Sequence, residues 1–223
     1  MFYQDLDNVD HSLIVFTSKG DTSYKLYSMA KQVGRKVHLI KPETNTFYIN
    51  ILDGTEKDVI ENMEELFKHA HAETDSITKV REDMERLLLR NAIKLVKRSL
   101  GEEATLEDVY NLITNKDGLG RKQIGNFGRI IVDDEELMIE NKELISWFLS
   151  CYYNETKNIY YLCRGVRLKI KELLDYQRLY QFEPKEADLP NFEKIIKNKE
   201  ILIVDSEVLK YREYAKLIGS YLL

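Results

Sequence analysis

Residues 12–21 read SLIVFTSKGD, a β-rich apolar run that stops at a short polar turn. Apolar residues then recur at helical spacing over 24–33, Gly34 follows, and a second β-rich run covers 36–40. This order predicts a strand at 12–17, a helix closed by Gly34, and a strand at 36–40. In such a β-turn-α-β unit, the turn lies at the sheet edge where parallel α/β proteins bind ligands.

The sequence contains no recognisable phosphate-binding loop to accompany this unit. Such a loop needs glycines that let phosphate approach the backbone, and a Lys-Ser/Thr pair for phosphate and magnesium. Residues 17–23 hold these residue types in the wrong order, and residues 118–125 end without a Lys-Ser/Thr pair. We therefore expect that this chain is not an enzyme, has no catalytic residues and carries no cofactor.

The middle of the chain has a helical pattern of apolar residues. Helices are expected at 55–71, 77–100, 105–114, 135–153 and 156–178. Thr105, with Asp108 three residues later, resembles a capping box at the start of the third helix, with Asp in place of the usual Glu or Gln. The glycines of the middle region mark an irregular segment, and they lie at positions 118, 120, 125 and 128. The run ILIV at 201–204 then predicts a third buried strand, and 209–223 a further amphipathic helix.

The predicted fold is mainly α, with a helical domain inserted into a partial α/β frame of about three parallel strands. The frame is discontinuous, because its strands come from both ends of the chain. We expect a first frame segment at 1–72, the helical domain at 73–198, and a returning strand and helix at 199–223.

Composition excludes several classes of protein. Of 223 residues, 43% are hydrophobic and 32% are charged, as in a folded globular protein rather than a disordered one. The net charge of −5 argues against a protein that coats nucleic acid through its overall charge, but it is compatible with a local basic patch. No apolar window is long enough to span a membrane, and Cys151 and Cys163 are expected to be buried thiols in a reducing compartment.

Metal-binding patterns are weak in this sequence. His69 and His71 lie two residues apart, so on a helix they point to different faces and do not readily share one ion. Two segments resemble a strand that ends in metal-binding acids, residues 130–135 (IIVDDE) and 201–207 (ILIVDSE). Such acids hold the magnesium of a nucleotide only when a phosphate loop lies beside them. We expect a loop that enters an acid-capped helix in the first case, a plain strand in the second, and no metal site.

Three short segments of the predicted frame form a recognisable series: residues 17–21 read TSKGD, 34–37 read GRKV and 50–53 read NILD. They resemble motifs of the TraG-like coupling proteins of conjugative type IV secretion. In that family an apolar strand ends Asp-Pro-Lys-Gly-Glu, a helix and a Gly-Arg-Lys-Val strand follow, and an Asn-Pro-Leu-Asp segment comes next. The residues carried over are Lys19, Gly20, Asp21 (in place of Glu) and Asn50, whereas Thr17, Ser18 and Ile51 depart from the motifs.

The resemblance implies that the helical block is the all-alpha domain of a P-loop-type ATPase, flanked by pieces of its nucleotide-binding domain. In that family this domain selects transfer substrates, either the DNA-processing complex with its relaxase and accessory proteins, or secreted proteins. The parent ATPases are hexameric, use ATP and Mg, and stand at the inner face of the cytoplasmic membrane. This chain is then expected to be a cytoplasmic monomer that recruits substrates to the secretion channel for DNA transfer.

A basic stripe on the helix predicted at 77–100 is the main candidate for contact with DNA or an acidic partner. Its residues are Arg86, Arg90, Lys94, Lys97 and Arg98. The first three are spaced four apart and share one helix face, while apolar residues occupy the opposite face for packing. The competing interpretation is a solvated face whose cations pair with neighbouring acids.

Two further clusters are open to two interpretations each. In the first cluster, tyrosines lie near cations, and the tyrosines either stack on nucleic-acid bases or form the edge of the core. Its residues are Lys157, Arg164, Arg167, Lys169 and Lys171 with Tyr152, Tyr153, Tyr160 and Tyr161. The second is the acidic run 133–143, which is a docking surface for a basic protein or a solvated helix face.

A different class of function stays open beside the recognition module. In this alternative, the chain is a self-standing α/β nucleotide-binding regulator or enzyme that uses a degenerate phosphate loop at Lys19 and Gly20.

Overall fold

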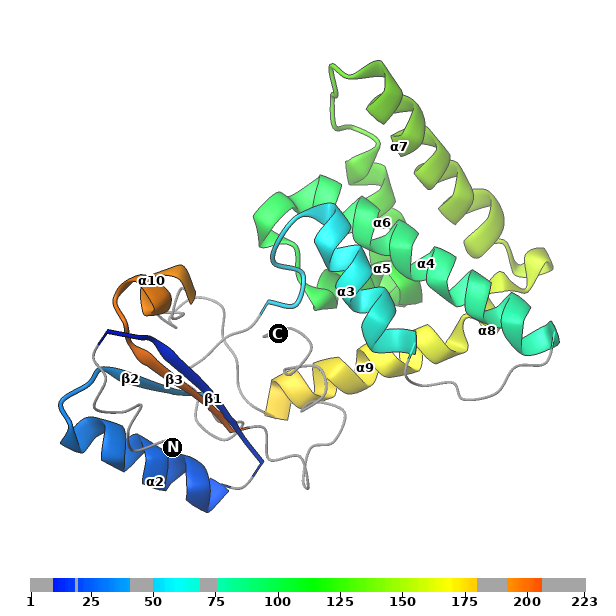
Figure 1. Ribbon diagram of the computed structural model, residues 1–223. Helices are drawn as coiled ribbons and strands as arrows, with labels where there is room; N and C mark the ends of the chain where they lie inside the picture. Colours follow the sequence, from blue (N-terminus) through cyan, green and yellow to red (C-terminus); the bar gives the residue numbers. More distant parts are fainter. Residues whose placement is uncertain (1–9, 19, 41–49, 69–75, 180–191, 206–223) are drawn as a thin grey trace. The chain divides into compact units, whose positions relative to one another are not determined.

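The computed structural model describes residues 10–18, 20–40, 50–68, 76–179 and 192–205 (Figure 1). The chain divides into two compact units. The α/β unit comprises Met1–Ile49 and Tyr176–Leu223, and the helical unit comprises Asn50–Asp175. Each unit is described by itself.

The α/β unit is built on a three-stranded parallel sheet of β1 (Leu13–Thr17), β2 (Val37–Ile40) and β3 (Ile201–Asp205). The strand order is β1-β3-β2, so the last strand of the described chain lies between the first two. Leu13 of β1 and Val37 of β2 both stand opposite Ile201 of β3. All of β3 is buried. The predicted third strand and the parallel arrangement are therefore confirmed.

Helix α2 (Gly20–Gln32) contacts all three strands and covers one face of the sheet (Figure 1). Its Ala30 lies in a core with Val37, Ile201 and Ile203. Gly34 follows the helix at φ +74°, a left-handed conformation that glycine adopts without steric cost and that commonly ends helices. The short helix α10 (Phe192–Lys197) precedes β3.

The helical unit is organised around one long central helix. Its helices are α3 (Glu56–Lys68), α4 (Ser76–Leu100), α5 (Leu106–Thr114), α6 (Leu119–Phe127), α7 (Glu135–Trp147), α8 (Ile159–Leu162) and α9 (Arg164–Leu179). Helix α4 contacts α3, α5, α6, α7 and α8. Leu88, Ala92, Leu95 and Val96 of α4 are at most 1% exposed, so the apolar face predicted for this helix is its core face. The mainly α fold with a small parallel sheet is confirmed.

The glycine-containing segment after α5 is helical rather than irregular, which corrects the sequence interpretation. A turn of 3₁₀-helix at Lys116–Gly118 leads into α6. Ile124 and Phe127 of α6 are buried at helical spacing, and this burial outweighs the cost of glycine inside a helix. The glycines misled the prediction, because of the four only Gly118 has a positive φ.

Two long helices predicted from periodicity are interrupted. The region expected to be one helix at 135–153 contains α7, which ends at Trp147, and a π-helical turn that follows it over Phe148–Tyr152. The helix expected at 156–178 is divided into a 3₁₀ turn at Glu155–Lys157, then α8 and α9. Asn158 separates the first two with φ 56°, a left-handed conformation that asparagine tolerates better than most residues.

Local capping signals were predicted correctly. Thr105 and Asp108 form a reciprocal capping box at the start of α5. Asp134 accepts a hydrogen bond from the Leu137 backbone N–H at the start of α7, so residues 130–135 are a loop that enters an acid-capped helix. Each cap satisfies a backbone donor that the first helical turn would otherwise leave unpaired.

The unit boundaries at 49/50 and 175/176 differ from the expected domain boundaries at 72/73 and 198/199. Helix α3 groups with the helical unit because Val59 and Met63 are buried and the helix packs against α4. The helix expected at 209–223 lies outside the described residues. Within the described part of the chain, no helix is long and apolar enough to cross a membrane.

Candidate functional site

The carboxyl edge of the sheet is the place where parallel α/β proteins bind ligands. Lys19 lies outside the described residues, Gly20 begins α2, and Asp21 is exposed in its first turn. Asp205 at the end of β3 is 1% exposed and accepts a hydrogen bond from the Ser23 hydroxyl at 2.6 Å. This buried acid therefore ties α2 to the central strand.

The opposite edge of the sheet holds a second buried acid. Glu200 accepts hydrogen bonds from Lys36 at 2.9 Å and from Asn198 at 3.2 Å, and lies 2.6 Å from His38 Nε2. Burial raises the pKa of Glu200, but the hydrogen bonds with His38, Lys36 and Asn198 outweigh burial together and bring that pKa down to about 2. This carboxylate joins the starts of β2 and β3 in its ionised form.

Asn50, the last of the four motif residues, has a structural role in the helical unit. Its side-chain amide donates to the Ala104 carbonyl at 2.8 Å, and its side-chain oxygen accepts from the Leu52 N–H at 3.1 Å. Leu52 is fully buried, and its carbonyl accepts from Lys97 Nζ at 2.9 Å. The NILD segment is thus fastened to α4 and to the chain after it.

The candidate basic stripe lies on α4, and its N-terminal half is the exposed part. Arg86 is exposed, and no hydrogen bond or ion pair joins it to the residues that the structure describes. Arg90 pairs with Glu64 of α3 at 2.7 Å, while 47% of its side chain remains exposed. These two side chains are accessible to a partner.

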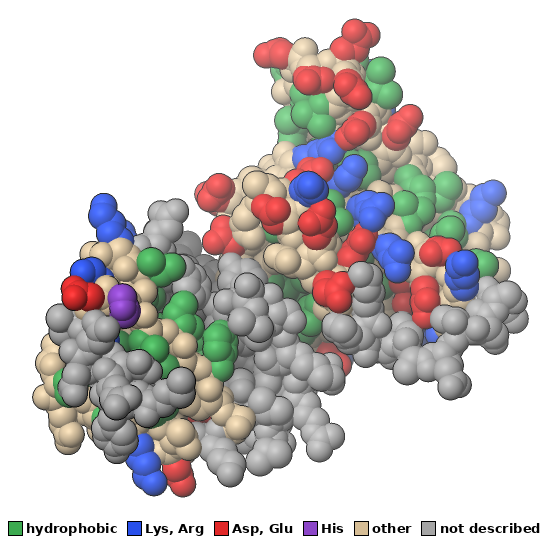
Figure 2. All heavy atoms as spheres, viewed as in Figure 1, with side chains coloured by type: hydrophobic (Ala, Val, Ile, Leu, Met, Phe, Trp, Pro, Cys, Tyr) green, Lys and Arg blue, Asp and Glu red, His purple; other side chains and the backbone are tan. Residues whose placement is uncertain are grey.

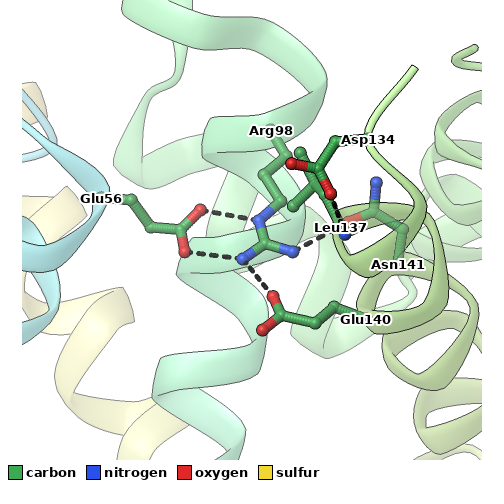
Figure 3. Close-up of polar contacts among 6 residues, drawn as sticks. All are labelled: Glu56, Arg98, Asp134, Leu137, Glu140 and Asn141. Carbon is green, nitrogen blue, oxygen red and sulfur yellow. Dashed lines mark hydrogen bonds and ion pairs between the residues drawn. The ribbon is translucent and has the colours of Figure 1, made fainter. Parts of the chain in front are cut away.

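The C-terminal half of the stripe is occupied by contacts within the helical unit. Arg98 is held by Glu56 of α3 through two hydrogen bonds at 2.8 and 2.9 Å, and by Glu140 and Asn141 of α7 at 2.8 and 2.9 Å (Figure 3). The hydrogen bond to Glu56 is the main cause that raises the pKa of Arg98. The hydrogen bond from Arg98, together with the charge of Lys94, lowers the pKa of Glu140.

The five stripe residues therefore do not act as one surface. Arg98 pairs with the acids Glu56 and Glu140 and so connects α4 to α3 and α7, whereas Lys97 donates to the Leu52 backbone carbonyl of the NILD segment. Only Arg86 and Arg90 combine a cation with an exposed side chain.

Helix α7 presents acidic and apolar side chains to the surface together. Figure 2 shows acidic side chains gathered over this helix, with hydrophobic ones between them. The exposed acids are Asp133, Asp134, Glu135, Glu136 and Glu143. Ile131 is 91% exposed and Ile139 is 50% exposed, whereas Leu144 is the one buried residue of α7. This mixture of charge and apolar area is typical of a protein-binding surface.

The tyrosine cluster lies around a pocket of the helical unit. Tyr152 and Tyr153 donate hydrogen bonds to the Ile113 and Leu112 carbonyls at the end of α5. Burial raises the pKa of both tyrosines, so the hydroxyls stay protonated as donors. The Arg167 guanidinium lies 3.7 Å above the Tyr160 ring, whereas 71% of Tyr161 is exposed.

The remaining cations of this cluster are dispersed. Lys169 donates to the Phe67 carbonyl and lies 4.8 Å above the Phe67 ring, while Lys157, Arg164 and Lys171 are exposed. Sequence reasoning missed Arg121, which lies 5.4 Å above the Tyr153 ring and lines the same pocket. Its position depends on the unpredicted helix α6, so no local signal pointed to it.

Comparison with known protein families finds no match, and none of the curated proteins matches this sequence.

Proposed function

We propose that this chain is the substrate-recognition part of a TraG-like coupling ATPase: its all-alpha domain with flanking pieces of the nucleotide-binding domain. In this role it recruits a DNA-processing complex or a secreted protein to the secretion channel on the cytoplasmic side. The supporting observation is topological. A helical block interrupts a parallel sheet, and the chain returns after it to place β3 between β1 and β2.

The motif residues support the proposal through their positions. The GRKV segment leads into β2, and the NILD segment stands at the start of the helical unit. This order along the chain agrees with the resemblance, in which the helical domain follows the strand region that carries the Lys-Gly motif. If the proposal is correct, the coding sequence before this chain encodes a phosphate-binding loop, and the sequence after it encodes a strand with metal-binding acids.

Two surfaces of the helical unit are the proposed contact sites for the substrate. The acidic and apolar face of α7 suits a protein with a basic, partly apolar segment, because opposite charges orient the encounter and apolar groups supply affinity. Arg86 and Arg90 of α4 suit DNA or an acidic partner. Arg98 contributes to these surfaces indirectly, by holding α3 and α7 on α4, and Lys97 holds the NILD segment there.

Binding of the relaxase encoded by the same transfer system tests the proposal. The purified full chain is titrated with the relaxase, and separately with duplex DNA, by biolayer interferometry. Glu135→Lys with Glu136→Lys reverses the acidic face, and Arg86→Glu with Arg90→Glu reverses the basic one. Lys57→Glu serves as a control, because Lys57 is an exposed α3 residue, 82% accessible, that belongs to neither surface.

We expect the wild-type chain to bind the relaxase. The α7 double variant should bind it about tenfold or more weakly, because its new lysines then face the basic segment of the partner. DNA binding that only the α4 double variant weakens would assign the direct DNA contact to Arg86 and Arg90. The proposal is wrong if the folded chain binds neither relaxase nor DNA, or if both double variants bind as the wild type does.

A further inference from the structure

A pocket of about 260 Å³ lies among α5, α6, α8 and the turns between α7 and α8. It is lined by Thr114, Asn115, Arg121, Tyr152, Tyr153, Asn154, Glu155, Asn158, Tyr160 and Tyr161. Four of these ten residues are tyrosines, and the set belongs entirely to the helical unit. A pocket of this size, close to the lower end of the range for ligand sites, suits one planar ring rather than a large molecule.

The tyrosine wall of the pocket is held rigidly by the structure around it. The Tyr152 ring stacks on Trp147 with an interplanar angle of 10°, and it lies 5.7 Å from the Tyr160 ring. The Tyr153 hydroxyl is bonded to the end of α5, where Gly120 approaches closely. A Cβ atom at Gly120 would lie 2.5 Å from the Leu112 backbone carbonyl oxygen and would also clash with that hydroxyl, so only glycine fits there. The wall is therefore formed before any ligand binds.

Tyr161 is the accessible ring of the pocket. It packs edge-on against Tyr160 at 5.9 Å, and 71% of the residue is exposed although it lines the pocket. A core-edge tyrosine would bury most of its ring, as Tyr152 does. An exposed aromatic ring at a pocket fixed by other aromatics provides a stacking surface.

The residues that line the pocket include one cation, Arg121, and one acid, Glu155. Arg121 and Arg167 already place guanidinium groups over two of the tyrosine rings, which are the positions a ligand cation would take. Arg121 is exposed at the rim. Among the described residues, no hydrogen bond holds the side chain of Glu155 or Asn158, and both can contact the polar edge of a ring.

We propose that this pocket binds a nucleotide, with its base stacked on Tyr161 and its phosphate near Arg121. Stacking, a rim cation and polar groups at the ring edge are the elements with which proteins bind unpaired bases. The inference does not depend on the proposed recognition role, because it rests on the pocket alone. The nucleotide is either free or part of a single strand of DNA, and the experiment separates these sources.

The test measures binding of three probes to the full chain at low salt. Fluorescence anisotropy follows a labelled single-stranded dT12, with an unlabelled duplex of equal length as competitor, and isothermal titration calorimetry follows dTMP. Tyr161→Leu removes the ring and Tyr161→Phe keeps it. Arg121→Ala removes the rim cation, and Lys122→Ala is its matched control, because Lys122 is an exposed cation on the same helix that does not line the pocket.

We expect dT12 to bind, Tyr161→Leu to weaken it by about tenfold or more, and Tyr161→Phe to leave it unchanged, since stacking needs the ring and not the hydroxyl. Arg121→Ala should weaken binding more than Lys122→Ala does. If dTMP also binds, and Tyr161→Leu weakens its binding, a free nucleotide is sufficient as the ligand. If dT12 binds and dTMP does not, the ligand is a single strand of DNA.

Three outcomes overturn the inference. The first is that neither dT12 nor dTMP binds the folded wild-type chain. The second is that Tyr161→Leu binds them as tightly as the wild type, which would place the nucleotide elsewhere. The third is that duplex DNA competes fully at equal concentration, because a paired base cannot stack on Tyr161. Relaxase binding is unaffected by any of these results, so failure here is distinguishable from failure of the recognition role.

Discussion

Individual buried acids of this protein are used to join segments that are distant in sequence. Glu85 of α4 is 8% exposed and accepts a hydrogen bond from the Gly165 backbone N–H at 3.1 Å, in the first turn of α9. Asp205 and Glu200 do the same for the α/β unit, through Ser23 and through Lys36. A carboxylate at a helix N-terminus satisfies an unpaired donor and interacts favourably with the helix dipole.

Replacing Glu85 with Ala should destabilise the helical unit by about 1–3 kcal/mol, because the part-buried Gly165 N–H loses its carboxylate acceptor. Glu85→Gln keeps an acceptor and should cost less. Urea unfolding followed by circular dichroism measures both. Asp83→Ala is the matched control on α4: Asp83 is exposed, so its loss should be nearly neutral. Equal effects of the Glu85 and Asp83 variants would contradict this role.

Glu200 should make the stability of the α/β unit depend on pH in the acidic range. Its pKa falls from 4.5 to about 2 on folding, so the folded state favours the ionised form. The contribution is complete above pH 4.5 and is lost progressively as the pH falls toward 2. Glu200→Gln should therefore be less stable than the wild type at pH 7, with a difference that shrinks below pH 4.5. Urea unfolding at several pH values measures this difference, and a constant difference would show that the charge plays no part.

At the scale of elements, polar connections hold α7 to the rest of the helical unit. Helix α7 buries only Leu144, so few apolar contacts hold it. Arg98 instead connects α7 to α4 and α3 through Glu140, Asn141 and Glu56 (Figure 3). With 14% of its side chain exposed, Arg98 forms charge-assisted hydrogen bonds that water competes with little.

Arg98→Ala should release α7 locally while the core around α4 stays folded. We expect faster hydrogen exchange across residues 135–147, and a loss of about 1–3 kcal/mol in unfolding free energy, because charged partners lose their donor. Arg98→Lys should rescue only in part, since an ammonium cannot form the two parallel bonds to Glu56. Lys57→Ala, which breaks an exposed 3.8 Å pair, is the control and should change neither quantity. Unchanged exchange over α7 in Arg98→Ala would refute this account.

The sequence predicted the elements whose signals are local, and missed those that depend on tertiary contacts. The apolar runs of β1 and β3, the packing face of α4 and the capping box at Thr105 were all readable from spacing. Helix α6 was missed because its glycines suggested a loop, although buried Ile124 and Phe127 stabilise the helix. The role of Arg98 was not predictable, since Glu56 and Glu140 each lie 42 residues away along the chain.

For the whole molecule, the strand order makes the α/β unit depend on both ends of the chain. Strands β1 and β2 each pair with β3, which lies between them. Without β3, their backbone N–H and C=O groups on that side have no partner, and the apolar core around Ile201 and Ile203 is lost. The helical unit draws its core from its own residues, such as Leu88 and Phe148.

A chain that ends at residue 175 should therefore lose the sheet and keep the helical unit. Hydrogen exchange read by mass spectrometry should show no protection over 13–17 and 37–40, and wild-type protection over the core of α4. The matched control is Ile203→Ala in the full chain: it removes one core side chain, costs about 2–5 kcal/mol, and weakens the sheet without removing its pairing. Protection of the first two strands in the shortened chain would mean that they find another partner. Loss of protection in α4 would mean that the helical unit cannot fold alone, and the insertion would then be part of one cooperative domain rather than a separable recognition module.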